Sequence, residues 1–147
     1  MLTVPDVLRR NHARRPLAPA VVDSMRRLSH RQLAERAWAV AGGLRKLGVR
    51  SGDTVAILCG NGVFSAETIL GAMAAGAVAV PLSWRWSAAE LEHGINDSRA
   101  TVLLGDDEHA PAARELMEAG RAPAVKHFIT EGAGYDEFLG DARPADV

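Results

Sequence analysis

The chain has 147 residues, of which 48% are hydrophobic and 24% are charged, and its formal net charge is -1. A chain of this length buries roughly 70% of its unfolded surface as one domain, and the composition excludes a disordered or fibrous protein. A net charge this close to zero creates no overall field that would attract nucleic acid or an acidic membrane, so we expect neither partner.

The sequence carries no signal for export or for membrane insertion. Its single cysteine, Cys59, cannot form an internal disulfide, so nothing favours an oxidising compartment. The N-terminus lacks the basic start and apolar run of a secretory signal. The longest apolar run, 69–82, is too short to span a bilayer and is broken by Gly71, Gly76 and Pro81. We therefore expect a cytoplasmic protein with no membrane span.

The first predicted element is a short amphipathic helix over residues 3–15. Val4, Val7 and Leu8 share one face of this helix, arginines surround the rest, and Pro16 ends it. The arginines fit a solvated helix face, because no aromatic side chains are interleaved with them as in a nucleic-acid patch.

A small hairpin and a longer helix follow. The strand-like runs 20–23 and 25–28 are separated by a tight Asp-Ser turn. Ser29 and Gln32 have the spacing of a capping box, in which two side chains satisfy free N–H groups at a helix start. Gly48 supplies the stop. The predicted buried stripe of this helix has the three- and four-residue spacing of one helical face: Leu33, Ala37, Val40, Ala41, Leu44 and Leu47.

From residue 54 onward, predicted strands alternate with helices. The strands are apolar runs without polar alternation, which is typical of parallel strands buried on both faces: 54–59, 77–81, 101–104 and 125–129. Helices are expected over 63–75, from the capping box of Ser87 and Glu90, and from a cap at Asp106 or Asp107 to Gly120. Residues 135–139 predict one further helical turn. Right-handed crossovers between such strands give an α/β fold with a mainly parallel sheet covered by helices.

Several of these segments, in this order, resemble the N-terminal region of acyl-CoA synthetases, in the adenylate-forming superfamily that also holds luciferases and peptide-synthetase adenylation domains. Residues 28–33 resemble the family's capped entry to its first long helix. Residues 44–57 resemble its Leu-Gly-Val, Gly-Asp and apolar-strand series, and 71–82 its helix-to-strand segment. Ser83-Trp84-Arg85-Trp86 resembles the Asn-Trp-Arg-Leu continuation. Glu67 stands where the family's helix often carries an acidic or aliphatic residue. An ordered set is far more specific than any single motif.

The resemblance implies that residues 1–147 form part of the N-terminal domain of the adenylate-forming enzyme fold. Residues 1–28 would be the N-terminal helix and hairpin, 29–130 the alternating helix and strand unit, and 131–147 a linker toward the phosphate loop. The family's catalytic groups are a Ser/Thr/Gly-rich phosphate loop, an acid that binds the ATP ribose, and a C-terminal lysine. None is present in the chain, so no catalytic residue is assigned.

The parent enzyme, by resemblance, activates a carboxylic acid with ATP to an acyl-adenylate and transfers the acyl group to CoA, with Mg accompanying ATP. We expect the fragment alone to be catalytically incompetent, with no cofactor bound. The expected partners are the remainder of the parent chain and other copies, through surface that the missing sequence would cover. The alternative is a stand-alone, non-catalytic binding or regulatory protein derived from the same fold.

The resemblance makes Arg85 the candidate for contact with the CoA phosphates, against a solvent-facing role in which Trp84 and Trp86 pack on the sheet. The turn 60–62, Gly-Asn-Gly, could approach a phosphate but lacks the third glycine of a dinucleotide fingerprint, which favours a structural turn. Cys59 is interpreted as a buried small side chain rather than a nucleophile. No metal site is expected, since metal-ligand spacing is absent among the five histidines: His12, His30, His93, His109 and His127.

Overall fold

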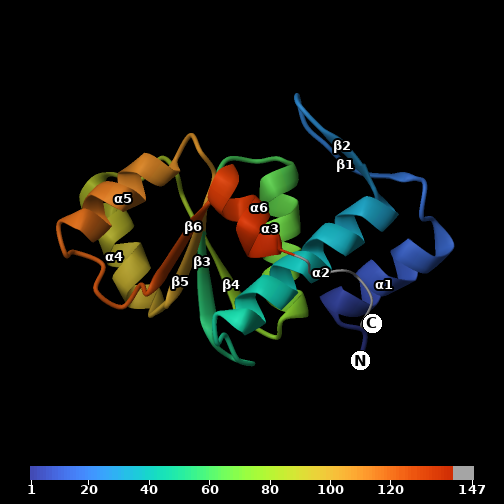
Figure 1. Cartoon of the computed structure of the whole chain (residues 1–147), viewed down its shortest axis with the longest axis horizontal. Coiled ribbons are helices and arrows are strands. Elements are labelled where there is room, and N and C mark those ends of the chain that lie inside the picture. Colours follow the sequence, from blue (N-terminus) through green and yellow to red (C-terminus); the bar gives the residue numbers. More distant parts are fainter. Residues whose placement is uncertain (141–147) are drawn as a thin grey trace.

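The centre of the molecule is a four-stranded parallel sheet, as the apolar runs predict (Figure 1). The expectation that the run 77–81 is buried on both faces is wrong, since Val78 and Pro81 in this edge strand are exposed. The structure, a computed structural model, describes residues 1–140. The strands stand in the order β4-β3-β5-β6. Their bounds are β3 Thr54–Leu58, β4 Val78–Leu82, β5 Val102–Gly105 and β6 His127–Thr130. The predicted fold class, an α/β unit with a parallel sheet covered by helices, is confirmed.

Strand order places the helices in two layers. The connections are α3 Val63–Ala74, α4 Ala88–Ser98 and α5 Ala110–Glu118. The chain moves one way along the sheet from β3 to β4 and the opposite way from β4 through β5 to β6. Because parallel crossovers are right-handed, α3 must cover one face while α4 and α5 cover the other. Figure 1 shows this division, with α2 and α6 (Ala133–Leu139) on the α3 side.

The side chains of β3 alternate between two cores. Val55 and Ile57 pack among residues of α2 and α3, whereas Ala56 and Leu58 pack among those of α4 and α5. Alternation between faces is inherent to a strand, and both faces are apolar here because both are covered. The continuous apolar run of this strand thus reflects a sheet with helices on each side.

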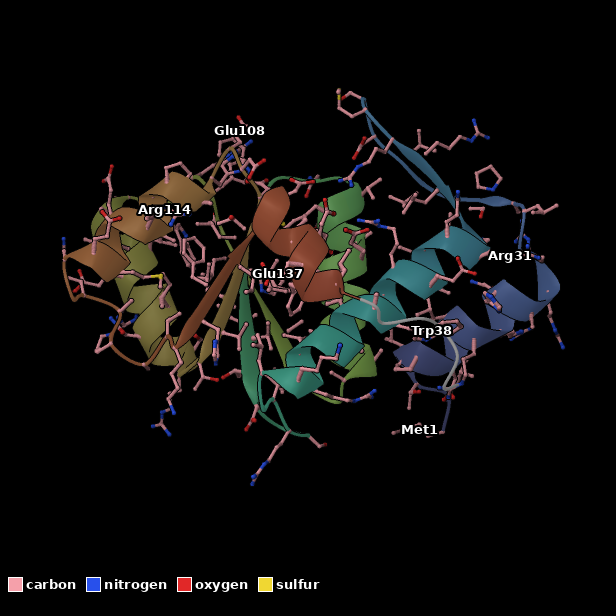
Figure 2. The ribbon with its side chains drawn as sticks, in the orientation of Figure 1. Met1, Arg31, Trp38, Glu108, Arg114 and Glu137 are labelled. Atoms are coloured by element: carbon pink, nitrogen blue, oxygen red, sulfur yellow. The ribbon has the colours of Figure 1, made fainter. Side chains whose placement is uncertain are left out.

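The N-terminal elements pack on the side of the molecule that α2 and α3 cover. They are α1 Val4–Arg14, the antiparallel pair β1 Pro19–Val22 and β2 Arg27–Ser29, and α2 His30–Lys46. Leu8 of α1 is buried against α2. Trp38 of α2 lies on the side of α1 (Figure 2), with its ring 5.1 Å from that of His12. Val4 and Val7, which are predicted to share one helix face with Leu8, are about 40% exposed. Of this helix only Leu8 is buried, although α1 contacts both α2 and α3.

Most predicted helix boundaries are confirmed. Ser29 with Gln32, and Ser87 with Glu90, form complete capping boxes. Gly48 has φ +87°, the left-handed conformation that glycine adopts after a helix end. Every predicted stripe residue of α2 is buried except the half-buried Leu47.

The predicted cap of α5 at Asp106 or Asp107 is wrong. The N-cap is His109, and it makes no side-chain cap bond. Asp106 instead accepts the His109 backbone N–H at 2.8 Å, in the turn before the helix. Its other carboxylate oxygen accepts the N–H of Gly60, just beyond the end of β3.

Residues 131–140, expected to belong to a linker with one helical turn, include α6, of which Tyr135 and Leu139 are buried in the core that α2 and α3 share. The remainder of the expected linker, 141–147, lies outside the described residues. Within residues 1–140, no helix is both long and apolar enough to cross a membrane.

The helices α2 and α3 lie so close together at Gly71 that an added methyl group there should lower the stability of the fold. A Cβ added to Gly71 of α3 would lie 2.4 Å from the Val40 Cβ and 2.9 Å from the Ala37 carbonyl oxygen of α2. Gly71→Ala should therefore lower the free energy of unfolding by about 2 kcal/mol through overpacking. Urea titration followed by circular dichroism measures it. The control is Gly134→Ala in α6, where nothing lies within 4 Å; equal stability of the two variants would contradict the prediction.

Candidate functional site

The carboxyl ends of the strands form the candidate site. In open α/β sheets, ligands bind outside these ends at the point where the strand order reverses. Here that point lies between β3 and β5, because β4 lies on one side of β3 and β5 on the other. The turn 60–62 and the loop 106–109 border it.

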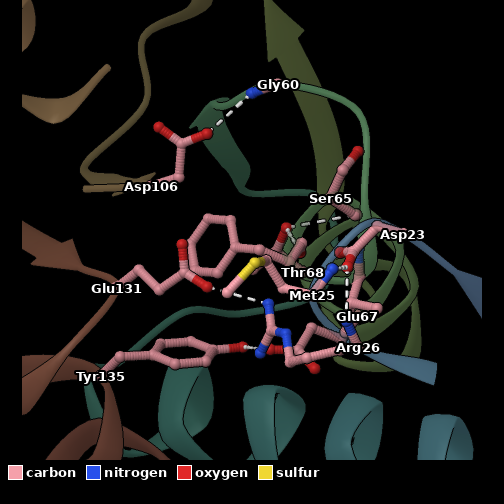
Figure 3. Close-up of polar contacts among 12 residues, drawn as sticks. Asp23, Met25, Arg26, Gly60, Ser65, Glu67, Thr68, Asp106, Glu131 and Tyr135 are labelled. Carbon is pink, nitrogen blue, oxygen red and sulfur yellow. Dashed lines mark hydrogen bonds and ion pairs between the residues drawn. The ribbon is translucent and has the colours of Figure 1, made fainter. Parts of the chain in front are cut away.

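The chain's own side chains bridge these two loops. The Asp106 Oδ2 atom accepts the Gly60 N–H at 2.8 Å, as Figure 3 shows. The other oxygen, Oδ1, lies 2.7 Å from the Nδ1 atom of His109. A Cβ on Gly60 would stand 3.4 Å from the His109 ring. The loops are thus joined by an Asp-His pair at the position where a doubly wound fold commonly holds a ligand.

A carboxylate also occupies the N-terminus of α3. Asp23, in the hairpin turn, accepts the Val63 N–H at 2.9 Å and the N–H groups of Met25 and Arg26 at 2.8 and 2.7 Å (Figure 3). These bonds, that from Val63 foremost, lower the pKa of Asp23. A helix N-terminus favours an anion, and Asp23 supplies it. This arrangement supports the interpretation of the turn 60–62 as structural.

A buried carboxylate joins α2, α3 and α6. Glu67 of α3 is fully buried. It pairs with Arg36, whose Nη2 lies 3.0 Å from Oε1. Glu67 also accepts the Tyr135 hydroxyl at 2.7 Å, and Figure 3 shows both of these residues. The bonds to Glu67 raise the pKa of Arg36, and burial raises that of Tyr135. Sequence reasoning missed this network. The available signal was one carboxylate within the otherwise uncharged α3.

A second ion pair holds the hairpin to the sheet. Arg26 Nη2 lies 2.9 Å from Glu131 Oε1, just beyond β6. Burial raises the pKa of Glu131, and the charge of Arg26 opposes this shift. Together with Asp23, the pair fixes the hairpin at both α3 and the carboxyl edge.

Cys59, at the end of β3, is unsuited to nucleophilic chemistry. Burial raises the pKa of its thiol to about 11, so it stays protonated near neutral pH. Because the thiolate is the reactive form, this favours the interpretation of Cys59 as a packing residue.

The loop that follows β4 presents Arg85 to solvent. Its guanidinium carbon lies 5.0 Å from the centroid of the Trp84 ring, and the side chain makes none of the ion pairs found within residues 1–140. The expectation that Trp84 and Trp86 both pack on the sheet is wrong, as they are 49% and 41% exposed. Trp86 instead lies against Gly94 of α4, and the Trp84 ring lies 5.1 Å from that of His109.

The histidines do not gather. His12 contacts Trp38 of α2, whereas His109 pairs with Asp106 in the loop after β5. Among the residues that the structure describes, no group of three or more His, Cys, Asp or Glu side chains could hold a metal ion.

These features define a class of protein, the open parallel α/β unit. An exposed arginine lies at the carboxyl edge of its sheet, and the Asp106–His109 pair bridges the loops at the point where the strand order reverses. Comparison with known proteins gives the family. The family model of AMP-binding enzymes matches residues 8–146, and the chain belongs to this family.

Similar sequences are ligases of greater length. A feruloyl-CoA synthase from Amycolatopsis sp is 42% identical over 106 residues, which are 72% of this chain and 21% of the relative. A fatty acid–acyl-carrier-protein ligase, ScoC, from Streptomyces coeruleorubidus is 33% identical over 133 residues, 90% of this chain and 26% of the relative. The chain thus spans about a fifth to a quarter of the length of these relatives.

Similar structures have the same fold. The N-terminal domain of FACL13 from Mycobacterium tuberculosis superposes with a TM-score of 0.89 at 29% identity, over 99% of this chain and 38% of that one. The anthranilate CoA ligase AuaEII, solved in complex with anthranoyl-AMP, gives a TM-score of 0.87 at 26% identity, over 94% of this chain and 27% of that one. The chain therefore matches the N-terminal part of adenylate-forming ligases.

Proposed function

We propose that the chain serves as the N-terminal part of an ATP-dependent acid–thiol ligase, which converts a carboxylic acid to an acyl-adenylate and transfers the acyl group to CoA. One observation carries the proposal: the similarity to the ligases ScoC and AuaEII extends over 90% and 94% of this chain, yet over only 26% and 27% of those ligases. ATP and Mg would be held by the remaining sequence of such a ligase.

The role proposed for this part is to position groups at the carboxyl edge of the sheet. Asp23 and Arg26 fix the hairpin, Asp106 joins the loops after β3 and β5, and Arg85 faces solvent from the loop after β4. A guanidinium has a fixed fork of donors that matches phosphate oxygens. Arg85 therefore fits the phosphates of the CoA nucleotide, and the exposed Trp84 ring beside it offers a face for stacking.

The chain alone should show no ATP–pyrophosphate exchange with ferulate, anthranilate or a fatty acid. Positioning and charge stabilisation of the phosphates supply most of the rate of phosphoryl and adenylyl transfer, and the proposal assigns those groups to the other part of the ligase. The same assay on a longer product of the gene should show exchange. Exchange above background by the 147-residue chain would contradict this division. A stop codon directly after Val147 would favour the binding-protein alternative.

Self-association of the isolated chain remains a prediction. The strand β4 is an edge of the sheet in the described residues, and Val78 at its start is 51% exposed. An unpaired edge with apolar side chains favours contact with another chain. The proline at position 81 limits this, because it has no N–H to donate.

A further inference from the structure

A continuous series of contacts connects the switch point with Arg85. It runs from the Gly60 N–H to Asp106, from Asp106 to His109, from the His109 ring to Trp84, and from the Trp84 ring to the guanidinium of Arg85. These residues belong to the loops after three neighbouring strands, β3, β5 and β4. The exposed arginine is thus linked to the rigid centre of the sheet through two aromatic rings.

The histidine ring in this series is held firmly. Its Nδ1 atom lies 2.7 and 2.9 Å from the two oxygens of Asp106, and its own backbone N–H donates to the same carboxylate at 2.8 Å. A carboxylate at Nδ1 requires a proton there, which fixes the tautomer. The side chain is only 15% exposed. His109 is therefore a rigid surface against which another ring can rest.

Trp84 depends on that surface. About half of its area is exposed, and the local bonds of its loop, from Arg85 N–H to Ser83 Oγ and from Trp86 N–H to the Ser83 carbonyl, orient backbone rather than the indole. The His109 ring, 5.1 Å away and tilted by 38°, lies against it. In turn, the indole face attracts the guanidinium of Arg85.

We propose that the Asp106–His109 pair is a positioning element that holds the Trp84 indole, and through it orients Arg85 toward an incoming phosphate. This inference rests on the proposed contact of Arg85 with CoA. The contribution of this positioning to CoA binding should equal that of a cation–π contact at an exposed site. Loss of the His109 side chain should therefore weaken CoA affinity by about two- to fivefold.

The first test needs only the 147-residue chain. With Trp38→Phe and Trp86→Phe, Trp84 is the sole tryptophan. The amplitude of its fast motion in time-resolved fluorescence anisotropy should rise clearly on His109→Ala and much less on His109→Phe, which keeps a ring. The matched control is His93→Ala, an exposed histidine of α4, which should leave the decay unchanged. An unchanged decay in His109→Ala, with circular dichroism showing a folded chain, would overturn the proposal.

The second test uses the longer ligase. His109→Ala should raise the KM for CoA about two- to fivefold, with a smaller change in kcat. In an Arg85→Ala background, it should add nothing, because the histidine acts through the arginine. Additive effects of the two variants would overturn the positioning role while leaving Arg85 in the CoA site. No effect of Arg85→Ala on CoA would instead overturn the proposed contact of Arg85 with CoA, and the anisotropy result would still decide whether His109 holds Trp84.

Discussion

Replacing Arg36 with methionine should lower the free energy of unfolding by about 3 kcal/mol, because it leaves a buried carboxylate without its cation. Glu67 is fully buried, and Tyr135 would remain as its hydrogen-bond donor. Removal of one partner of a buried pair costs about 3 to 5 kcal/mol, and we take the lower end because Arg36 keeps a third of its side chain exposed. Urea unfolding monitored by circular dichroism measures the loss.

Two further variants make this result specific to the ion pair. Arg31→Met changes an exposed arginine of the same helix and should alter stability by less than about 0.5 kcal/mol. Arg36→Met combined with Glu67→Leu removes both charges and should recover much of the loss, since apolar replacements of buried pairs are often neutral. A loss below about 1 kcal/mol in the single variant would show that water or another group compensates Glu67.

Substitution of Arg85 by alanine in the longer ligase should weaken the use of CoA by about tenfold to a hundredfold, since a charge-assisted hydrogen bond contributes roughly 1.5 to 3 kcal/mol. The KM for CoA should carry the effect, whereas pyrophosphate exchange should change little, because CoA enters after adenylation in the proposed reaction.

Steady-state kinetics with CoA and with dephospho-CoA tests this contact. If Arg85 binds the phosphate that dephospho-CoA lacks, the variant should lose the preference for CoA. Lys126→Ala is the matched control, because Lys126 is exposed at the opposite, amino-terminal edge of the sheet, where its N–H meets Thr101. An unchanged KM for CoA, or an equal loss in exchange, would remove Arg85 from the site.

The sequence predicted the parallel sheet and most helix starts because both depend on local patterns. Capping boxes such as Ser29 with Gln32 satisfy backbone groups within four residues, and buried strands such as β3 are apolar whichever neighbours they have. The strand order, in contrast, depends on how crossovers pack, and no single segment carries that information.

The contacts of the site were harder to predict because they join distant residues. Asp23 meets Val63 across 40 positions, and Arg26 meets Glu131 across 105. Nothing local distinguishes Asp23, in a turn, from any other turn aspartate, and its role at α3 appears only when the hairpin is folded back. The prediction for Asp106 failed for a related reason, since its carboxylate bonds to Gly60, in the loop after the neighbouring strand β3, as well as to His109 in its own loop.

The separation of Glu67 from Tyr135 bears on how the chain is made. A ribosome adds Glu67 of α3 68 residues before it adds Tyr135, and at about 5 to 20 residues per second this interval lasts about 3 to 14 s. During that time Arg36 is already synthesised, but the hydroxyl that completes the pairing of the carboxylate is not. Burial of Glu67 in its final surroundings therefore awaits the synthesis of α6, and we expect the layer of α2 and α3 to close around the carboxylate only after that helix emerges.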